Sequence, residues 1–274
     1  MVRGPVALTL PFVLAVSAGA ADLQPRTLAA FTRYVDLTEG RIAREVSDSS
    51  RFLWIDTLSD DDRRSVLATL GEGKVAIERR RTPEDGAPVS IDDGMIHHWV
   101  GTVFVPGVPV DAAVALMQDY DRHATLFAPA IAGSRTMSRV GNRFRVFLRF
   151  YMKKVLAATV NTENDAEFFR PSVDRAYSAI RSTRVAEVDN PGTPEERERE
   201  PGHDSGFVWR LNTYWRFAER DGGTYVQCES VSLSRDVPLG LGWIIKPFIT
   251  DVPKDALTFT LERTRAVLTS QEQH

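Results

Sequence analysis

A change of hydrophobic period near Met95 limits the folds open to this chain. Before Met95, apolar residues recur at the spacing of helical turns, and after it they alternate with polar residues over long stretches. The first pattern is typical of amphipathic helices and the second of strands with one buried face. The sequence therefore predicts a helical N-terminal part followed by a region of antiparallel sheet.

One stretch in the middle of the chain shows the alternation most clearly. Phe144, Val146 and Phe150 fall on one face of a predicted strand, and Arg145 and Arg149 fall on the other. Such alternation indicates a sheet with one buried face and one wet face. Strands are predicted at about 95–105, 133–140, 143–152, 156–169, 174–188, 206–219 and 223–235.

The predicted strand at 206–219 repeats the pattern with larger side chains. Trp209 and Trp215 are predicted to point inward, and Arg216 to face out. The glycines at 222 and 223 then predict a hairpin turn, because glycine accepts the positive φ that tight turns require. Short connections of this kind favour an antiparallel sheet.

A single long helical pattern is left to cover the buried face of this sheet. It runs from about Pro253 to Leu268, with Leu257 and Leu261 on one stripe. A large sheet with one wet face must bury its other face against another layer, so we expect the sheet to wrap around this helix. The apolar segment 237–248 before it is too short to span a bilayer, which needs about 20 apolar residues. We interpret that segment as a flap.

The chain before Met95 is predicted to form a helical extension. Phe31 and Tyr34 belong to an apolar stripe at helical spacing, and Ser59, followed by three aspartates, is predicted to cap a second helix. We expect this extension to cover residues 21–94 and the sheet domain to cover residues 95–270.

Residues 1–20 have the pattern of a secretory signal peptide. Arg3 supplies a positive charge, an apolar run begins at Val6, and small residues lead up to Ala20. This pattern predicts cleavage near Ala20 and a mature protein that is periplasmic or secreted from a bacterial cell. The alternative, an uncleaved membrane anchor, is disfavoured because the apolar run is short.

Composition and motifs exclude several classes of function. The formal net charge of -3 lacks the basic footprint of a nucleic-acid-binding protein, so no nucleic acid partner is expected. The single cysteine, Cys228, excludes an intramolecular disulfide and is expected to be buried in a strand. The sequence has no phosphate-binding glycine loop, dinucleotide fingerprint or nucleophile elbow, so we predict no cofactor and assign no catalytic residue.

The histidines give no metal site on sequence grounds. His97 and His98 are adjacent on a predicted strand and therefore point to opposite faces. No cysteine or carboxylate at a suitable spacing completes a zinc set. His123 is a candidate acid or base near the rim of a cavity, with a structural role as the alternative.

The order of these elements resembles that of the START-like superfamily, also called SRPBCC, whose members have the helix-grip fold. The residues that carry the resemblance are Asp119–Pro129, where members have an aspartate, an aromatic residue and a proline, and Asp236–Trp243, the approach to the last helix. The resemblance covers about 95–268 and points to uncharacterised secreted bacterial members. It implies an α+β fold: a curved antiparallel sheet of about seven strands around a long C-terminal helix, with an N-terminal helical extension.

The resemblance also implies a cavity between the sheet and the helix. The leading function is then non-catalytic binding or transport of an apolar or amphipathic, lipid-like molecule in the cell envelope, with transient membrane contact. The alternatives are a polyketide-cyclase-like enzyme that uses the same cavity and an envelope module that binds an unidentified protein partner. The candidate ligand-binding residues are Phe144, Phe150, Tyr177, Arg181, Trp209, Trp215, Trp243, Phe248 and Phe259.

Two features keep alternatives open. If Arg181 faces the cavity, it receives the polar head of a ligand, because a buried charge demands a partner; the alternative is an Arg–Glu pair between strands. The enzyme alternative would rely on polar residues such as Tyr177, Arg181 or Glu229. The long polar loop 189–205 is either a lid or disordered.

Overall fold

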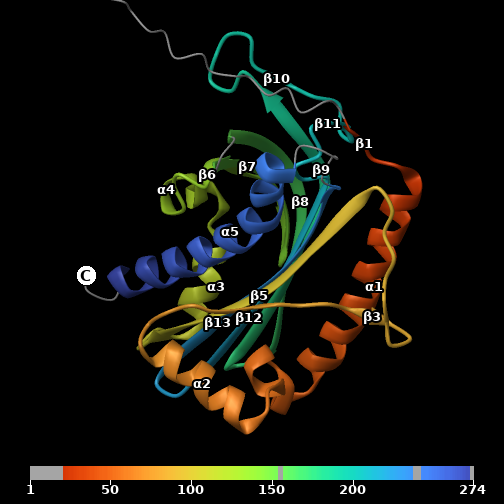
Figure 1. Ribbon diagram of the computed structural model, residues 1–274. Helices are drawn as coiled ribbons and strands as arrows, with labels where there is room; N and C mark the ends of the chain where they lie inside the picture. The colour runs from red at the N-terminus through yellow and green to blue at the C-terminus, as the bar shows by residue number, and fades with distance from the viewer. Residues whose placement is uncertain (1–20, 154–156, 237–241, 272–274) are drawn as a thin grey trace, which may run out of the picture.

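The computed structural model describes residues 21–153, 157–236 and 242–271, without the side chains of residues 242–250 and 271. The predicted signal peptide and residues 237–241 of the predicted flap lie outside these described ranges. The described residues form a large antiparallel sheet with helices on both of its faces (Figure 1).

The central sheet has the strand order β2-β5-β13-β12-β9-β8-β7-β6, and the short strand β10 pairs with β9. The first long strand, β5, therefore lies beside the last, β13. The seven predicted strands are confirmed, and β2 and β10 are added to them. The strands are β2 (Ala76–Arg79), β5 (Gly94–Pro106), β6 (Ile131–Val140), β7 (Arg143–Lys153), β8 (Ala157–Ser172), β9 (Arg175–Asp189), β10 (Arg197–Glu198), β12 (Arg210–Arg220) and β13 (Gly223–Arg235).

The C-terminal helix α5 (Gly242–Gln271) crosses one face of the sheet, as predicted (Figure 1). Leu257 and Leu261 on this helix are buried. The helix comes close to the sheet at Gly101, where an added Cβ would stand 2.6 Å from Leu261 Cδ1. The helix begins before the predicted Pro253, so residues 242–248 of the predicted flap are helical and not a loop.

Three short helices connect β5 to β6 on the same side of the sheet as α5. Their apolar residues belong to one buried cluster together with α5 and the strands. They are α3 (Val110–Gln118), η3 (Tyr120–Arg122) and α4 (His123–Leu126).

The N-terminal helices cover the opposite face of the sheet (Figure 1). A second buried cluster joins Phe31, Trp54 and Ile55 of this segment to Tyr214 and Val231 of the sheet. The sheet face that was predicted to face water is therefore buried at β5, β12 and β13, beneath the N-terminal helices. The helices are α1 (Pro25–Ser47), η1 (Ser49–Arg51), η2 (Trp54–Thr57) and α2 (Asp60–Gly71), and Ser59 caps α2 as predicted.

Charged side chains between α1 and the sheet form a buried network. Arg216, predicted to face water, is 1% exposed and donates to Glu45 at 2.7 Å and to the Phe52 carbonyl at 2.8 Å. Glu229, also 1% exposed, pairs with Arg41 and accepts from His98 at 2.6 Å. Burial alone raises the pKa of Glu229, but His98 and the two guanidinium groups hold that pKa below its usual value.

The polar segment 189–205 is fastened to the sheet and does not line the cavity described below. Strand β10 pairs with β9, and Arg149 donates to Glu196 at 2.7 Å. Farther along, β11 (His203–Asp204) pairs with β1 (Ala21–Asp22), so the segment also contacts the start of the described chain. A separate hairpin, β3 (Pro83–Glu84) and β4 (Ala87–Pro88), lies between α2 and β5 in the sequence.

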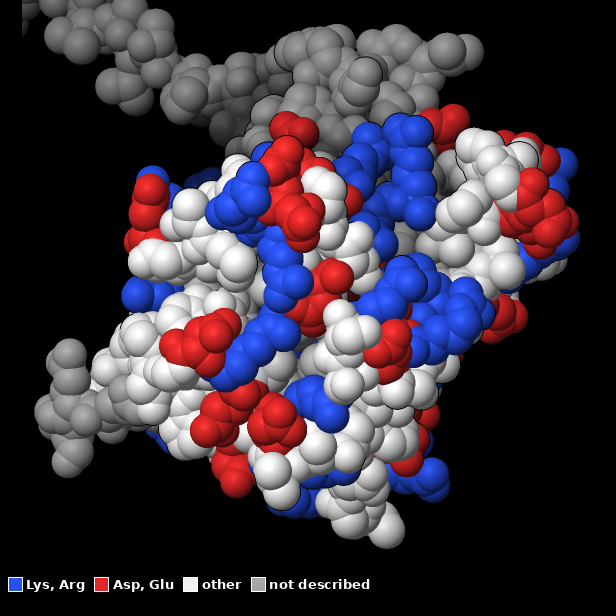
Figure 2. Space-filling model, turned by 90° about the horizontal axis from the view of Figure 1, so that it is seen from below, with Lys and Arg blue, Asp and Glu red and all other residues white. Residues whose placement is uncertain are grey.

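The surface carries charges of both signs. Figure 2 shows acidic side chains distributed among the basic ones on the face seen from below. No helix in the described part of the chain has the length and apolar character needed to span a membrane.

Candidate functional site

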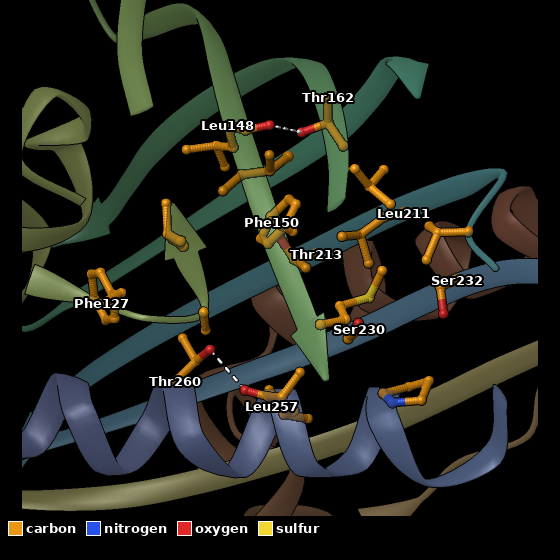
Figure 3. Close-up of a pocket in the computed structure, with 18 of the residues that line it drawn as sticks. Phe127, Leu148, Phe150, Thr162, Leu211, Thr213, Ser230, Ser232, Leu257 and Thr260 are labelled. Atoms are coloured by element: carbon orange, nitrogen blue, oxygen red, sulfur yellow. Dashed lines mark hydrogen bonds between the residues drawn. The ribbon is translucent and has the colours of Figure 1, made fainter. Parts of the chain in front are cut away.

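An apolar cavity of about 200 Å³ lies between α5 and the sheet (Figure 3). Strands β7, β8, β9, β12 and β13 form its roof, and α5 forms its floor. The helical segment between β5 and β6 closes one end with Met117, Tyr120, His123 and Phe127. Among the described residues that line the cavity, none is charged.

Small side chains on β13, opposite α5, leave the space open. Cys228, Ser230 and Ser232 occupy alternate positions of β13, and Leu211 and Thr213 do so on β12. Because side chains at alternate positions share one face of a strand, these residues all point toward α5. A row of larger residues here would fill the gap between sheet and helix.

Helix α5 lines the cavity with apolar side chains and with Thr260, whose hydroxyl is already hydrogen-bonded within the helix. Leu257 and Thr260 point toward the cavity (Figure 3), and Thr260 Oγ1 donates to the Ala256 carbonyl at 2.8 Å. Ala256 lines the cavity and is itself exposed to solvent.

The polar groups in the cavity are uncharged. Thr162 donates to the Leu148 carbonyl at 3.2 Å and accepts from Asn164 at 2.8 Å. Burial raises the pKa of Tyr120 and lowers that of His123. Both side chains are therefore neutral near pH 7.

Two of the predicted ligand-binding residues, Phe150 and Trp215, line the cavity. Phe144 is buried on the same face of the sheet but outside the lining, where it packs against Tyr120 with ring centroids 5.5 Å apart. Phe259 lies on α5, half-buried and also outside the lining.

Three predicted residues lie away from the cavity. Arg181 forms a bidentate pair with Glu39 of α1 at 2.6 and 2.8 Å, so it pairs with the N-terminal helix and not with a neighbouring strand. Tyr177 shares that face of β9 and packs against the second buried cluster. Trp209 precedes β12, so the alternation of the strand does not extend to it, and it donates to Asp204 at 3.1 Å. The side chains of the remaining two, Trp243 and Phe248, lie outside the described residues.

The two adjacent histidines have separate partners. His97 lies 2.9 Å from the Ser234 hydroxyl, whereas His98 lies between Tyr34 and Glu229. The described residues hold no group of three His, Cys, Asp or Glu side chains placed to bind a metal ion.

The burial of His97 predicts a pH-dependent stability. Burial and the charge of Arg79 lower the pKa of His97 to about 4, from 6.5. The unfolded chain then takes up the proton first as the pH falls, so this stability is present above about pH 6.5 and is lost toward pH 4. Relative to His97→Gln, we expect the wild-type free energy of unfolding in urea to fall by roughly 2–3 kcal/mol between about pH 7.5 and 4.5. The same pH profile in both proteins would contradict this.

The residues that sequence reasoning missed are mainly small and polar. Thr213, Ser230 and Ser232 line the cavity, but hydroxyl groups in a strand carry no signal of a ligand on their own. Their spacing could have indicated the cavity, because small residues at every second position of β13 face the long helix and leave space beneath it. Cys228 belongs to this row and is buried, as predicted.

No protein-family model and no curated protein matches the sequence. Similar solved structures include human STARD10, with 10% identity, a TM-score of 0.45 and coverage of 79% of this chain and 83% of that chain. An aromatase/cyclase from Streptomyces sp. R1128 has 13% identity, a TM-score of 0.45 and coverage of 64% and 94%. A STAR-related lipid transfer protein from Xanthomonas axonopodis has 14% identity, a TM-score of 0.41 and coverage of 70% and 98%.

The names of these structures include a STAR-related lipid transfer protein and an aromatase/cyclase. Because their identities and TM-scores are low, the function proposed below rests on the cavity of this chain. The fold rests on its own topology, in which the first long strand pairs with the last and the terminal helix crosses the sheet. The protein therefore has the α+β helix-grip fold that its sequence resemblance to the START-like superfamily implies.

Proposed function

We propose that the protein binds an apolar or amphipathic, lipid-like molecule in this cavity and releases it unchanged. The observation that carries the proposal is an apolar cavity, between sheet and helix, whose described lining residues include no charge. Ligand pockets are usually apolar with a few placed polar groups, and this cavity matches that composition.

The positions of the candidate catalytic residues favour binding over chemistry. Arg181 pairs with Glu39, and Glu229 pairs with Arg41 and His98, all on the face covered by the N-terminal helices. A cyclase-like enzyme is the second candidate, favoured by the neutral His123 in the cavity wall. Turnover of an aromatic polyketide-type substrate that is lost in His123→Ala would support the enzyme.

Retention of a ligand tests the binding function directly. Delipidated mature protein, incubated with a lipid extract, is expected to retain a defined molecule in native mass spectrometry. A protein that emerges without any retained molecule would overturn the proposal.

A bulky side chain at Ser230 is expected to block the cavity. Ser230 points from β13 into the cavity (Figure 3), so the ring in Ser230→Phe would occupy ligand space. We expect the affinity for an uncharged apolar dye to fall roughly tenfold or more, a loss of about 1.4 kcal/mol, as measured by fluorescence titration.

Ser138→Phe is the matched control for this variant. Ser138 lies on β6, is exposed and does not line the cavity. We expect it to bind the dye as the wild type does. Equal dye binding by folded Ser230→Phe and Ser138→Phe would show that the dye binds elsewhere.

We also propose that the protein acts in the cell envelope after removal of residues 1–20. The charged start, apolar run and small residues before Ala21 support this location. N-terminal sequencing of protein from a periplasmic fraction is expected to begin at or near Ala21. Recovery of the intact chain from the cytoplasm would contradict it.

A further inference from the structure

The hydroxyl of Tyr120 is a buried polar group without a partner among the described residues. The side chain is 1% exposed, and no described residue makes a hydrogen bond to its oxygen. Its ring lines the cavity and is held against His123 and Phe144, with centroids 4.9 and 5.5 Å away. Buried polar groups in native proteins are nearly always hydrogen-bonded, and among the described residues none bonds this hydroxyl, so a bound ligand is a candidate partner.

His123, the neighbour of Tyr120 in the wall, offers an acceptor. Its Nε2 lies 3.2 Å from the Leu116 carbonyl, which can only accept, so Nε2 carries the proton. Burial lowers the pKa of His123, so the ring is neutral and Nδ1 is unprotonated. No described residue donates to Nδ1. Tyr120 and His123 both line this end of the cavity, so a hydroxyl donor and a ring-nitrogen acceptor belong to neighbouring side chains of its wall.

The ligand group that matches both is a hydroxyl, since it accepts one hydrogen bond and donates another. An ether or ester oxygen accepts from Tyr120 but leaves His123 Nδ1 without a donor. A carboxylate would be buried with no cation among the described lining residues, which is costly. We propose that the cavity selects an uncharged apolar molecule with a hydroxyl group, held between Tyr120 and His123. This inference rests on the proposed binding function.

The wall also contains competing hydroxyls. Ser230, Ser232 and Thr213 face the cavity from β12 and β13 (Figure 3). The hydroxyl of Tyr120, in contrast, is buried and has no hydrogen-bond partner among the described residues. A hydrogen bond from a ligand hydroxyl therefore stabilises the complex more at Tyr120 than at the β12 and β13 hydroxyls. A test must distinguish binding at these two parts of the wall.

Matched probes test the selection. Decanol, its methyl ether and decanoate share one chain and differ in the polar end, and each displaces the uncharged dye N-phenylnaphthylamine from the protein. We expect the wild type to bind decanol about three- to tenfold more tightly than the ether, the usual range for one hydrogen bond, and decanoate most weakly. In Tyr120→Phe, dye binding is expected to persist while decanol and its ether, which both accept from the Tyr120 hydroxyl, each bind about three- to tenfold more weakly than to the wild type.

Controls separate this inference from the binding function. Tyr225→Phe removes a hydroxyl that donates to Asp221 on the other face of the sheet, and it should keep the preference. His123→Leu should lose the preference, because only decanol can donate to Nδ1. A preference that survives in His123→Leu but disappears in Ser230→Ala would overturn the assignment, as would an unchanged decanol affinity in Tyr120→Phe or tightest binding of decanoate. Failure of the wild type to bind the dye would instead overturn the proposed function.

Discussion

A chain that lacks residues 22–73 is expected to be recovered unfolded or aggregated. These residues carry Phe31, Trp54 and Ile55, which are buried against the sheet. Each such side chain contributes about 1.5–3 kcal/mol when buried, and a typical domain has a total stability of only about 5–15 kcal/mol. The deletion would also leave Arg216 and Glu229 without Glu45 and Arg41. Soluble yield and circular dichroism during urea titration measure the outcome.

The full chain with Arg64→Glu is the control for this deletion. Arg64 lies on α2 with an exposed side chain, so its replacement should leave folding unchanged. Because the deletion is expected to unfold the protein, exposed substitutions of this kind are the better test of whether the N-terminal helices bind a protein partner. A truncated chain that is monomeric and unfolds cooperatively would contradict the prediction.

Arg216→Met is expected to destabilise the protein by about 3–5 kcal/mol, the usual cost of breaking a buried ion pair by removing one partner. Arg216 is almost fully buried and bonds Glu45 and the Phe52 carbonyl, and its guanidinium lies 3.6 Å from Glu229. Methionine fills similar space but leaves these oxygens without their donor. Urea unfolding at neutral pH gives the difference in free energy.

Arg143→Met provides the matched comparison. Arg143 also lies on a strand and pairs with Glu167 at 2.7 Å, but its side chain is 73% exposed. Exposed pairs contribute about 0–1 kcal/mol, so this variant should be close to the wild type. Similar losses in the two variants would show that burial does not govern the cost.

The local pattern of the sequence predicted the elements of the fold. Seven long strands, the terminal helix and the cap at Ser59 appear where hydrophobic period and capping residues indicated them. The pattern predicted the first residues of strands and helices less accurately. Trp209 lies before the first residue of β12, and α5 begins before the Pro253 that was predicted to start it.

The candidate site was predicted in part. Phe150 and Trp215 line the cavity because alternation within a strand is a local property. Tyr177 and Arg181 do not, because neither face of β9 is plainly apolar and the sequence could not say which one meets α5. His123 was predicted near the cavity and lines it, but the neighbouring Tyr120 gave no signal of its own.

The sequence by itself determined which segments are strands and which are helices, because hydrophobic period and turn residues act over a few neighbouring positions. Only the tertiary structure decided what covers each face of the sheet. Arg216 and Glu229 read as solvent-facing or cavity residues until α1 brings Glu45 and Arg41 against them. The cavity itself depends on the gap left between α5 and the small residues of β13, and a gap between segments distant in the chain is not encoded in the pattern of either segment.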